Sequence, residues 1–283
     1  MMQQIKVNEN VDRRYLGALR MIDRVTGNEL NRPVRVTAPG LRFFLNRSFL
    51  QVISQAKGLE AHLEVFETPP DEPDALTREF TLSIEDPSGE YLPRSASIDL
   101  PLVAAPGEEN SLFTPIDIKL FVAPAAHASP NWSIIRASIY DLADMEAEDP
   151  VAGALLRVLD ANGQLLMSGL SDQRGEAAVI IPGIPITTFS TGTEPDGDPE
   201  TDPNDAEDWL AAGSVIETET PVTLEIVVSP ATPWPVDPSV MEARRNEWRR
   251  QFRDNDSDQV RDGLALELKT GETQSVKLFV NLT

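Results

Sequence analysis

The sequence predicts an all-β protein made of two tandem Ig-like or transthyretin-like β-sandwiches, with one amphipathic helix inserted in the second. Three observations support this prediction. Apolar residues fall in short runs with period-two alternation, which is typical of half-buried strands. Gly, Pro, Asp and Asn separate most of the runs, and the 23 prolines disfavour long helices because proline lacks an N–H and fixes φ. A chain of 283 residues is long enough for two domains with separate cores.

The first half contains a series of short runs with this alternation. The predicted strands are residues 15–23, 34–38, 49–55, 61–67, 79–86, 95–102 and 114–122. The stretch 68–74 (TPPDEPD) is predicted to be a loop. The stretch DPSGEYLPR is predicted to be a turn between two strands, with Tyr91 as its aromatic anchor.

A change in composition marks the boundary between the two sandwiches. Residues 1–10 form a polar leader, and 11–122 form the first sandwich. The small, proline-containing stretch 123–131 (APAAHASPN) is the linker. Residues 132–283 form the second sandwich, which is interrupted by an acidic loop at 187–221 and by the helical insertion at 230–262.

The second half begins with a predicted strand at 132–141. The segment PVAGALLRVLDANGQLLMSGLSDQRGEAAVIIPGIP follows and predicts three strands separated by two turns. Asn162-Gly163 suits a hairpin because both residues tolerate positive φ. In the second turn, Asp172 can accept from backbone N–H groups while Gly175 supplies the permissive backbone.

The insertion at 230–262 contains the one predicted helix. Asp237 suits the N-cap and Pro238 the first helical position, whose N–H is not needed. We expect this helix to continue to about Arg253. The remaining segment, GLALELKTGETQSVKLFVNLT, predicts a terminal hairpin around Thr270-Gly271.

The two halves share a layout. A strand ends in Ile22-Asp23 in the first half and in Tyr140-Asp141 in the second. About ten residues later comes Pro-Val, at positions 33–34 and 150–151, followed by the next strand. This self-similarity favours two copies of one sandwich type over one large fold.

The second half resembles the carboxypeptidase regulatory-like domain, a transthyretin-type β-sandwich. The matching features are Pro150-Val151-x-Gly153-Ala154, the strand 155–159, the turn 160–163, and Ser171-Asp172-x-x-Gly175 before a strand that closes on Pro182-Gly183. The resemblance implies a non-catalytic accessory scaffold. The family's zinc-binding His-x-x-Glu pattern is not matched at either histidine, His62 or His127.

Composition excludes several classes of function. The net charge of −22 opposes binding to phosphate backbones, so we expect no nucleic-acid partner. The absence of cysteine excludes disulfides and thiolate chemistry. No run approaches the length of a membrane span, and the polar N-terminal residues do not form a signal peptide. We therefore expect synthesis in the cytoplasm, with later release, or incorporation into a virion-like or injection particle, left open.

Residues for catalysis are scarce. Two histidines about 65 positions apart cannot hold a metal without further ligands. The sequence contains no Gly-x-Ser-x-Gly elbow and no glycine-rich phosphate loop. We expect no enzymatic activity and no cofactor, with calcium as the one ion to consider.

The acidic insertion is where calcium would bind. Asp196, Asp198, Glu200 and Asp202 alternate at spacing two, and oxygen-rich loops suit a hard cation. Against this, Gly197 does not follow the third ligand, and nearby prolines stiffen the turn. A solvated acidic loop without an ion is the alternative.

The predicted helix combines an apolar stripe with many arginines. Met241, Trp248 and Phe252 recur at helical spacing, and the basic residues around them are Arg244, Arg245, Arg249, Arg250 and Arg253. As Trp and Arg are enriched at interface hot spots, the helix is a candidate docking element. Alternatively, the stripe caps its own sandwich and the arginines pair with the protein's own acids.

The stretch LRFFLNRSFLQV offers a second candidate. It places Arg42 and Arg47 beside Phe43, Phe44 and Phe49. The stretch is either a plain pair of strands or an exposed sheet edge that invites an added strand from a partner.

The leading functional hypothesis is a non-enzymatic structural or adaptor protein that docks with other subunits of a larger assembly, with self-association left open. The layout RRYLGALRMIDRVTG … DPSGEYLPR … LFVAPAAHASPNW … PVAGA resembles accessory proteins of phage tails and phage-tail-like contractile injection systems. One alternative is a carbohydrate- or ligand-binding module that uses Trp132, Trp209, Trp234 and Trp248. Another is a calcium-stabilised binding domain.

Overall fold

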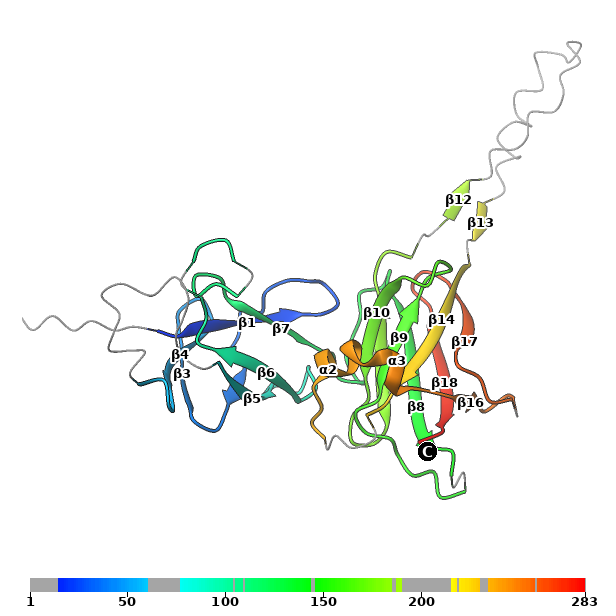
Figure 1. Cartoon of the computed structure of the whole chain (residues 1–283). Coiled ribbons are helices and arrows are strands. Elements are labelled where there is room, and N and C mark those ends of the chain that lie inside the picture. The colour runs from blue at the N-terminus through cyan, green and yellow to red at the C-terminus, as the bar shows by residue number, and fades with distance from the viewer. Residues whose placement is uncertain are drawn as a thin grey trace, which may run out of the picture. The chain divides into compact units, whose positions relative to one another are not determined.

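The structure is a computed structural model. It describes residues 15–60, 77–103, 105–108, 110–143, 146–184, 187–189, 215–217, 219–229, 234–257 and 259–282. The predicted strand 61–67 lies outside these residues. The chain is all-β, as the sequence predicts, and divides into two compact units (Figure 1). Unit 1 is Met1–Leu120 and unit 2 is Phe121–Thr283.

Unit 1 contains two sheets with a core between them. One sheet has the order β3-β4-β1-β7, and the other has the order β2-β5-β6. Leu19, Ile53 and Leu82 are fully buried in the core. The strands are β1 (Gly17–Asp23), β2 (Arg35–Thr37), β3 (Leu41–Leu45), β4 (Gln51–Ala56), β5 (Arg78–Glu85), β6 (Arg94–Leu100) and β7 (Ile116–Leu120).

Unit 2 also contains two sheets with a core between them. One sheet has the order β10-β9-β14-β15, with β17 also paired to β14, and the other has the order β11-β8-β18-β16. The first sheet contains β9 (Leu155–Leu159), β10 (Leu165–Leu170), β14 (Thr220–Val227), β15 (Arg249–Arg250) and β17 (Leu264–Leu268). The second contains β8 (Ser133–Asp141), β11 (Glu176–Ile181), β16 (Phe252–Asp254) and β18 (Thr273–Val280); β12 (Thr187–Phe189) and β13 (Val215–Glu217) form a separate ribbon.

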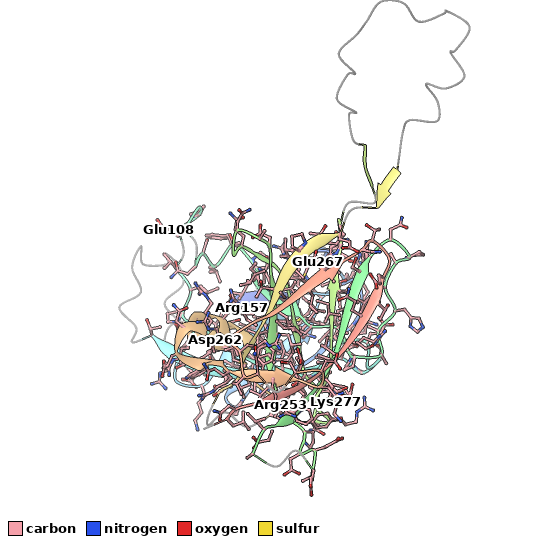
Figure 2. All side chains as sticks on the ribbon, turned by 90° about the vertical axis from the view of Figure 1, so that its right-hand side faces the viewer. Glu108, Arg157, Arg253, Asp262, Glu267 and Lys277 are labelled. Carbon is pink, nitrogen blue, oxygen red and sulfur yellow. The ribbon has the colours of Figure 1, made fainter. Side chains whose placement is uncertain are left out.

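Aromatic rings and cations share one face of the second sheet. The rings of Tyr140 and Phe279 lie 5.9 Å apart. Lys277 and Arg253, side by side in Figure 2, both lie over the Phe279 ring, at 5.5 and 5.7 Å from its centroid. Such cation–π contacts cover aromatic surface that would otherwise face water.

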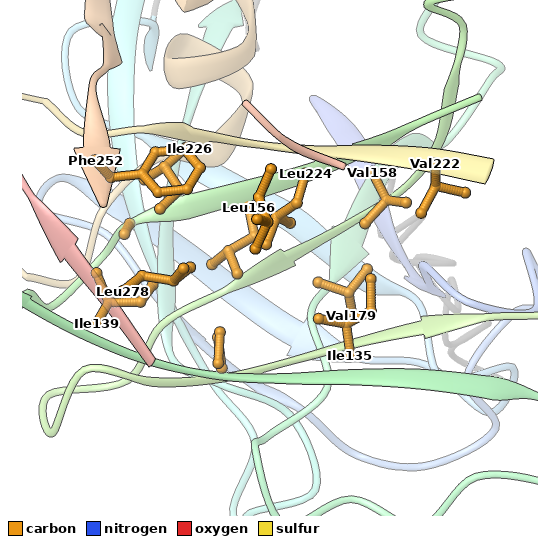
Figure 3. Packing of buried hydrophobic residues seen from close by; sticks show 14 of the residues in the cluster. Ile135, Ile139, Leu156, Val158, Val179, Val222, Leu224, Ile226, Phe252 and Leu278 are labelled. Atoms are coloured by element: carbon orange, nitrogen blue, oxygen red, sulfur yellow. The ribbon is translucent and has the colours of Figure 1, made fainter. Parts of the chain in front are cut away.

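The core of unit 2 lies between its two sheets (Figure 3). Leu156, Val158 and Leu224 of one sheet face Ile135 and Ile139 of the other. All five side chains are fully buried. β9 is buried on its outer face as well, because the helical segment α2 (Pro238–Ala243) packs against it.

The two turns of the segment 150–185 have different roles. The first joins β9 and β10 as a hairpin, in which the Asp160 carboxylate accepts from the N–H groups of Asn162 and Gln164 at 2.8 and 2.7 Å. In the second turn Asp172 accepts from Glu176 N–H at 3.0 Å. This turn carries the chain to the opposite sheet, because β11 pairs with β8.

The predicted terminal hairpin around Thr270-Gly271 is wrong. β17 pairs with β14, whereas β18 pairs with β8 and β16. The turn therefore crosses from one sheet to the other. The two strands alternate in a way that suits either pairing, so local sequence cannot distinguish a hairpin from a crossover.

The prediction of one continuous helix to Arg253 is also wrong. Asp237 caps α2 as predicted and accepts from Ser239 N–H at 2.9 Å, but Arg244 breaks the helix. α3 is only Arg245–Trp248. After it, β15 pairs with β14, and β16 pairs with β18, so sheet hydrogen bonds replace helical ones. Among the described residues, no helix is long and apolar enough to span a membrane.

The internal repeat is present, with one change in alignment. Asp23 and Asp141 each end the first strand of their unit, and each carboxylate accepts from the N–H two residues later, at 2.8 and 3.0 Å. In each unit the first and last strands also pair in parallel, β1 with β7 and β8 with β18. The Pro-Val alignment is wrong. The N–H of Val151 donates to the Ile139 carbonyl, two residues before Asp141, and in unit 1 the equivalent bond runs from the N–H of Leu30 to the Met21 carbonyl. Leu30, not Val34, is therefore the counterpart of Val151.

Glycine substitutions test the crossing turn. Gly163 and Gly175 have φ of 76° and 75°, but a Cβ on Gly175 would lie 2.3 Å from the Ile139 carbonyl oxygen, whereas Gly163 has open space. We expect Gly163→Ala to cost about 1 kcal/mol and Gly175→Ala about 3 kcal/mol. All four tryptophans lie in unit 2, so urea unfolding followed by their fluorescence measures both variants. Equal costs would contradict the steric explanation.

Candidate functional site

The apolar stripe of the helical insertion is buried in its own unit. Met241, Trp248 and Phe252 are 1 %, 8 % and 0 % exposed. The three side chains therefore present no surface to a partner. Of the two interpretations that the sequence left open, capping of the second sandwich describes these three residues.

A network of ion pairs joins the helical segment to the sheet, and Arg249 is the arginine of the insertion that belongs to it. Arg157 of β9, beside α2 in Figure 2, donates to Glu225 at 2.6 Å and to Glu242 at 3.0 Å. Arg249 donates to the other oxygen of Glu225 at 3.0 Å. Arg157 and Glu225 are buried, so this network ties the helical segment to the sheet beneath it.

The remaining arginines of the insertion lie near the surface. The Arg244 guanidinium is 5.1 Å from the centre of the Trp248 ring. Arg245 donates to the Glu242 carbonyl at 3.3 Å. The Nε of Arg250 is buried without a hydrogen-bond partner. Arg244 and Arg245 are exposed to solvent, whereas Arg250 is half-buried.

Most of the other predicted binding residues lie outside the part of the chain that the structure describes. Asp196, Asp198, Glu200 and Asp202 lie outside the described residues, as does Trp209. Within the described part of the chain, no group of three or more His, Asp or Glu side chains could hold a metal ion. Trp132 and Trp234 are half-buried.

A polar cluster fixes the turn that Tyr91 was predicted to anchor. Arg32 donates to Asp86 at 2.9 Å and to Ser88 at 2.8 Å, and its guanidinium lies 5.1 Å from the centre of the Tyr91 ring. Burial raises the pKa of the Tyr91 phenol, and its hydrogen bond to the Asp23 carboxylate adds to the rise. The phenol therefore stays protonated and ties the turn to the end of β1.

The pKa of Asp86 shifts the other way. Burial alone would raise it, but the hydroxyl and N–H of Ser88, the N–H of Tyr91 and the Arg32 guanidinium lower it below its ordinary value. Every group in this cluster has a structural partner. We assign the cluster to the stability of unit 1.

The feature of unit 1 that suits binding is an apolar groove of about 570 Å³. Its floor is a cross-strand row on the outer face of one sheet, formed by Ala18 of β1, Val52 of β4 and Phe44 of β3. Tyr15 forms a wall, with its ring 5.1 Å from that of Phe44 and tilted by 54°. Leu112 also lines the groove. We call these residues, with Gly17, Asn46 and Leu50, the aromatic groove.

The β3–β4 turn closes one end of the aromatic groove. The Asn46 side chain accepts from the N–H groups of Ser48 and Leu50, both at 2.9 Å. Phe49 takes a positive φ of 59° in this turn. Asn46 and Leu50 are thereby held in place as lining residues.

Hydrogen bonds to Ser111 hold the turn that carries Leu112 and Phe113. Ser111 is buried, and its hydroxyl accepts from Phe113 N–H at 3.2 Å while its carbonyl accepts from Thr114 N–H at 3.1 Å. Leu112 lines the groove, whereas Phe113 is 63 % exposed. Tyr15, Phe44 and Leu45 are also among the exposed large apolar residues of unit 1. Of these exposed residues, Tyr15 and Phe44 line the groove.

The groove lies beside a free sheet edge. β3 is the terminal strand of its sheet, so among the described strands none pairs with its outer side. Phe43 packs against the core, and Phe44, on the opposite face, is 39 % exposed. Of the two interpretations of the stretch LRFFLNRSFLQV, the pair of strands is present as β3 and β4, and the addition of a partner strand at the outer side of β3 stays a prediction.

The lining of the groove suits binding. It offers aliphatic carbons, two aromatic rings, the Asn46 amide and the Tyr15 phenol. Sequence reasoning found Phe44 but missed Tyr15, Ala18 and Leu112, which join it only through folding. The alternation of small and large side chains in YLGALR was a local signal for an outward-facing Ala18.

Comparison with known proteins does not assign the chain to a family. No protein-family model and no curated sequence matches it. The Bacillus anthracis TIE protein aligns at 9% identity over 94% of this chain and 34% of its own, with a TM-score of 0.27. A Bacteroides ovatus protein, named for a proposed role as an adhesin, aligns at 9% identity over 82% of this chain and 85% of its own, with a TM-score of 0.17.

This chain thus spans about a third of the TIE protein's length. At these TM-scores neither alignment identifies a shared fold family. Conclusions about function rest on the geometry alone.

The buried ion network predicts a large cost for removing one member. Glu225→Leu leaves the buried Arg157 without its nearest partner, and we expect a loss of about 3 kcal/mol in unfolding free energy. The double variant Arg157→Met/Glu225→Leu removes both charges and should recover most of that loss. Glu219→Ala removes the exposed Glu219–Lys269 pair and should change stability by about 0.5 kcal/mol or less. Urea unfolding followed by tryptophan fluorescence measures all three. A double variant no better than the single would contradict the charge argument.

The Asp86 cluster predicts a dependence on pH. Because the pKa of Asp86 is lower in the folded protein, its ionised form stabilises unit 1 above the unfolded pKa of about 3.9. This contribution is lost as pH falls through the folded pKa. We expect Asp86→Asn to weaken unit 1 at pH 7 and to flatten its loss of stability in acid, whereas Glu85→Gln at an exposed neighbour should do neither. NMR signals of β5 and β6 during urea titration report on unit 1. An unchanged acid profile in Asp86→Asn would argue against this role.

Proposed function

We propose that the protein is a non-enzymatic structural or adaptor protein that docks into a larger multi-protein assembly through the aromatic groove of unit 1. The groove on the open sheet face carries this proposal. It combines exposed aromatic rings, an apolar floor and a neighbouring sheet edge. Aromatic residues in such settings are frequent hot spots of protein interfaces.

Unit 2 has a different part in this proposal. Its helical insertion is a cap, because Met241, Trp248 and Phe252 are buried within the unit. Our proposal therefore places docking on the groove of unit 1, and docking through the exposed arginines of the helical segment, Arg244 and Arg245, stays a prediction. Unit 2 then serves as a rigid module, held together by the Arg157–Glu225 network.

Carbohydrate binding has less support. Trp248 is buried, and Trp132 and Trp234 are half-buried, so these three offer little flat aromatic surface for stacking on a sugar. The aromatic groove itself is mostly apolar and has one amide, whereas sugars need several convergent polar groups.

The kind of assembly is the finer part of the proposal. Tandem sandwiches in an acidic, cysteine-free chain suit a phage tail or a phage-tail-like contractile injection system, as the layout of the sequence suggested. In such a particle the groove would contact a neighbouring subunit.

Docking is tested by placing a charge in the groove. We expect wild type to be recovered in a large complex from the cells that make it, and Phe44→Glu to be recovered alone, because a buried carboxylate at the interface opposes apolar contact. Leu165→Glu is the matched control, since Leu165 is similarly exposed but lies on β10 of unit 2. Mass photometry gives the size of each species, and circular dichroism checks folding. Complexes of equal size from wild type and Phe44→Glu would refute docking through this groove.

A further inference from the structure

Exposed cations lie along the β3–β4 pair, and one of them, Lys57, interacts electrostatically with the Glu60 carboxylate. Arg42 and Arg47 are exposed at the two ends of β3, on either side of Phe44 and Leu45, and Lys57 follows β4. Among the described residues, neither of these two arginines makes an ion pair. Other arginines of unit 1 form ion pairs, such as Arg20 with Asp117 at 2.6 Å and Arg35 with Glu85 at 3.0 Å.

The distribution of charge makes these cations unusual for this chain. Unit 2 has 11 basic and 28 acidic residues, whereas unit 1 has 13 and 18. Most of the net charge of −22 therefore belongs to unit 2. Because charges are screened beyond about 8 Å at physiological salt, Arg42 and Arg47 are the described charges at the ends of β3 that a partner on this strand would meet.

The edge of β3 suits a partner segment in an extended conformation. An extended segment beside β3 would find a free strand edge, and every second side chain would point to the face that carries Phe44. An apolar side chain at such a position would continue the row of Ala18, Val52 and Phe44. The side chains two positions away along the segment point to the same face and lie toward the ends of β3, where Arg42 and Arg47 are.

We propose that the aromatic groove and the β3 edge bind an extended segment of a partner protein in which an apolar side chain is flanked by Asp or Glu. The apolar side chain contacts Phe44 and Tyr15, and the carboxylates pair with Arg42 and Arg47. Guanidinium groups suit this role because they bind carboxylates through two parallel hydrogen bonds. This inference rests on the proposed docking function and names the chemistry of its partner.

The alternative role for the arginines is protection. Charged residues on edge strands prevent sheets from pairing by accident, and the irregular register between Arg42 and Phe43 serves the same end. In that case the arginines would exclude partners without selecting among them. The two roles differ in what happens when the charges are reversed.

The experiment selects peptides from a phage-displayed library of random dodecapeptides on the full-length protein. We expect the enriched peptides to carry aromatic or aliphatic residues beside Asp or Glu, and to lose binding to Phe44→Glu. Selection on Arg42→Glu/Arg47→Glu should enrich Lys or Arg instead. An acidic peptide selected on wild type should bind this double variant about tenfold more weakly, with a smaller difference at high salt.

The matched control is Arg35→Glu/Lys119→Glu, which makes the same change in net charge at exposed positions on β2 and β7. It should bind the acidic peptides nearly as wild type does, because its changes are not on β3. Equal weakening in both double variants would overturn the local role of Arg42 and Arg47. Circular dichroism and thermal unfolding confirm that each variant is folded.

The outcomes separate this inference from the proposed function. Peptides that depend on Phe44 but show no preference for acid would overturn the inference and leave docking intact. Absence of any Phe44-dependent peptide would count against both. Self-association of wild type that Phe44→Glu abolishes would assign the groove to a second copy. NMR shifts confined to the groove on removal of residues 1–14 would assign it to the chain's own leader, and either assignment overturns the acidic partner.

Discussion

The parallel pairing of the first and last strands is the constraint on which each unit depends. In unit 1, β1 lies between β4 and β7, and in unit 2, β8 lies between β11 and β18. The last strand must therefore reach the sheet that holds the first, whatever the chain does between them. In unit 2 this requirement makes the turn at Thr270-Gly271 a crossover between sheets. It also leaves β16 as the edge strand next to β18.

The first sheet of unit 2 explains why a helix-like sequence ends as strand. β14 has β9 on one side, and on the other side β17 and β15 occupy successive parts of its length. Arg249 and Arg250 complete this edge, and Arg249 meets Glu225 there. The outward-facing Arg157 and Glu225 are buried only because the α2–α3 segment lies over them. The α2–α3 cap, the edge strand β15 and the Arg157–Glu225 network therefore depend on one another.

Sequence reasoning succeeded where the cause was local. The hairpin at Asn162-Gly163, the N-cap at Asp237 and the anchor at Tyr91 each depend on residues within a few positions. It failed where two distant segments compete for the same residues: the stretch after Arg244 has helical spacing, but free edges on β14 and β18 offer it sheet hydrogen bonds. The groove shows the same limit, because Tyr15, Phe44 and Leu112 are far apart in sequence and only the order of strands brings them together.

The internal repeat indicates why a groove is found on unit 1. The aligned aspartates, Asp23 and Asp141, place Ala18 of β1 at the position of Arg136 of β8. Both side chains lie on the outer face, since their neighbours in each strand are core residues. Arg136 donates to the carbonyls of Pro124 and Ala126, so in unit 2 a long side chain and the preceding segment cover this position.

Ala18 can make no such contact, and its small size is what leaves the floor of the aromatic groove open between Tyr15, Val52 and Phe44. The aligned positions thus differ in their contacts: Arg136 is bonded to the segment that precedes β8 in unit 2, whereas Ala18 lines the aromatic groove of unit 1. Contact with another protein would remove apolar surface of the Tyr15 and Phe44 rings from water, and this is the physical basis of the docking that we propose.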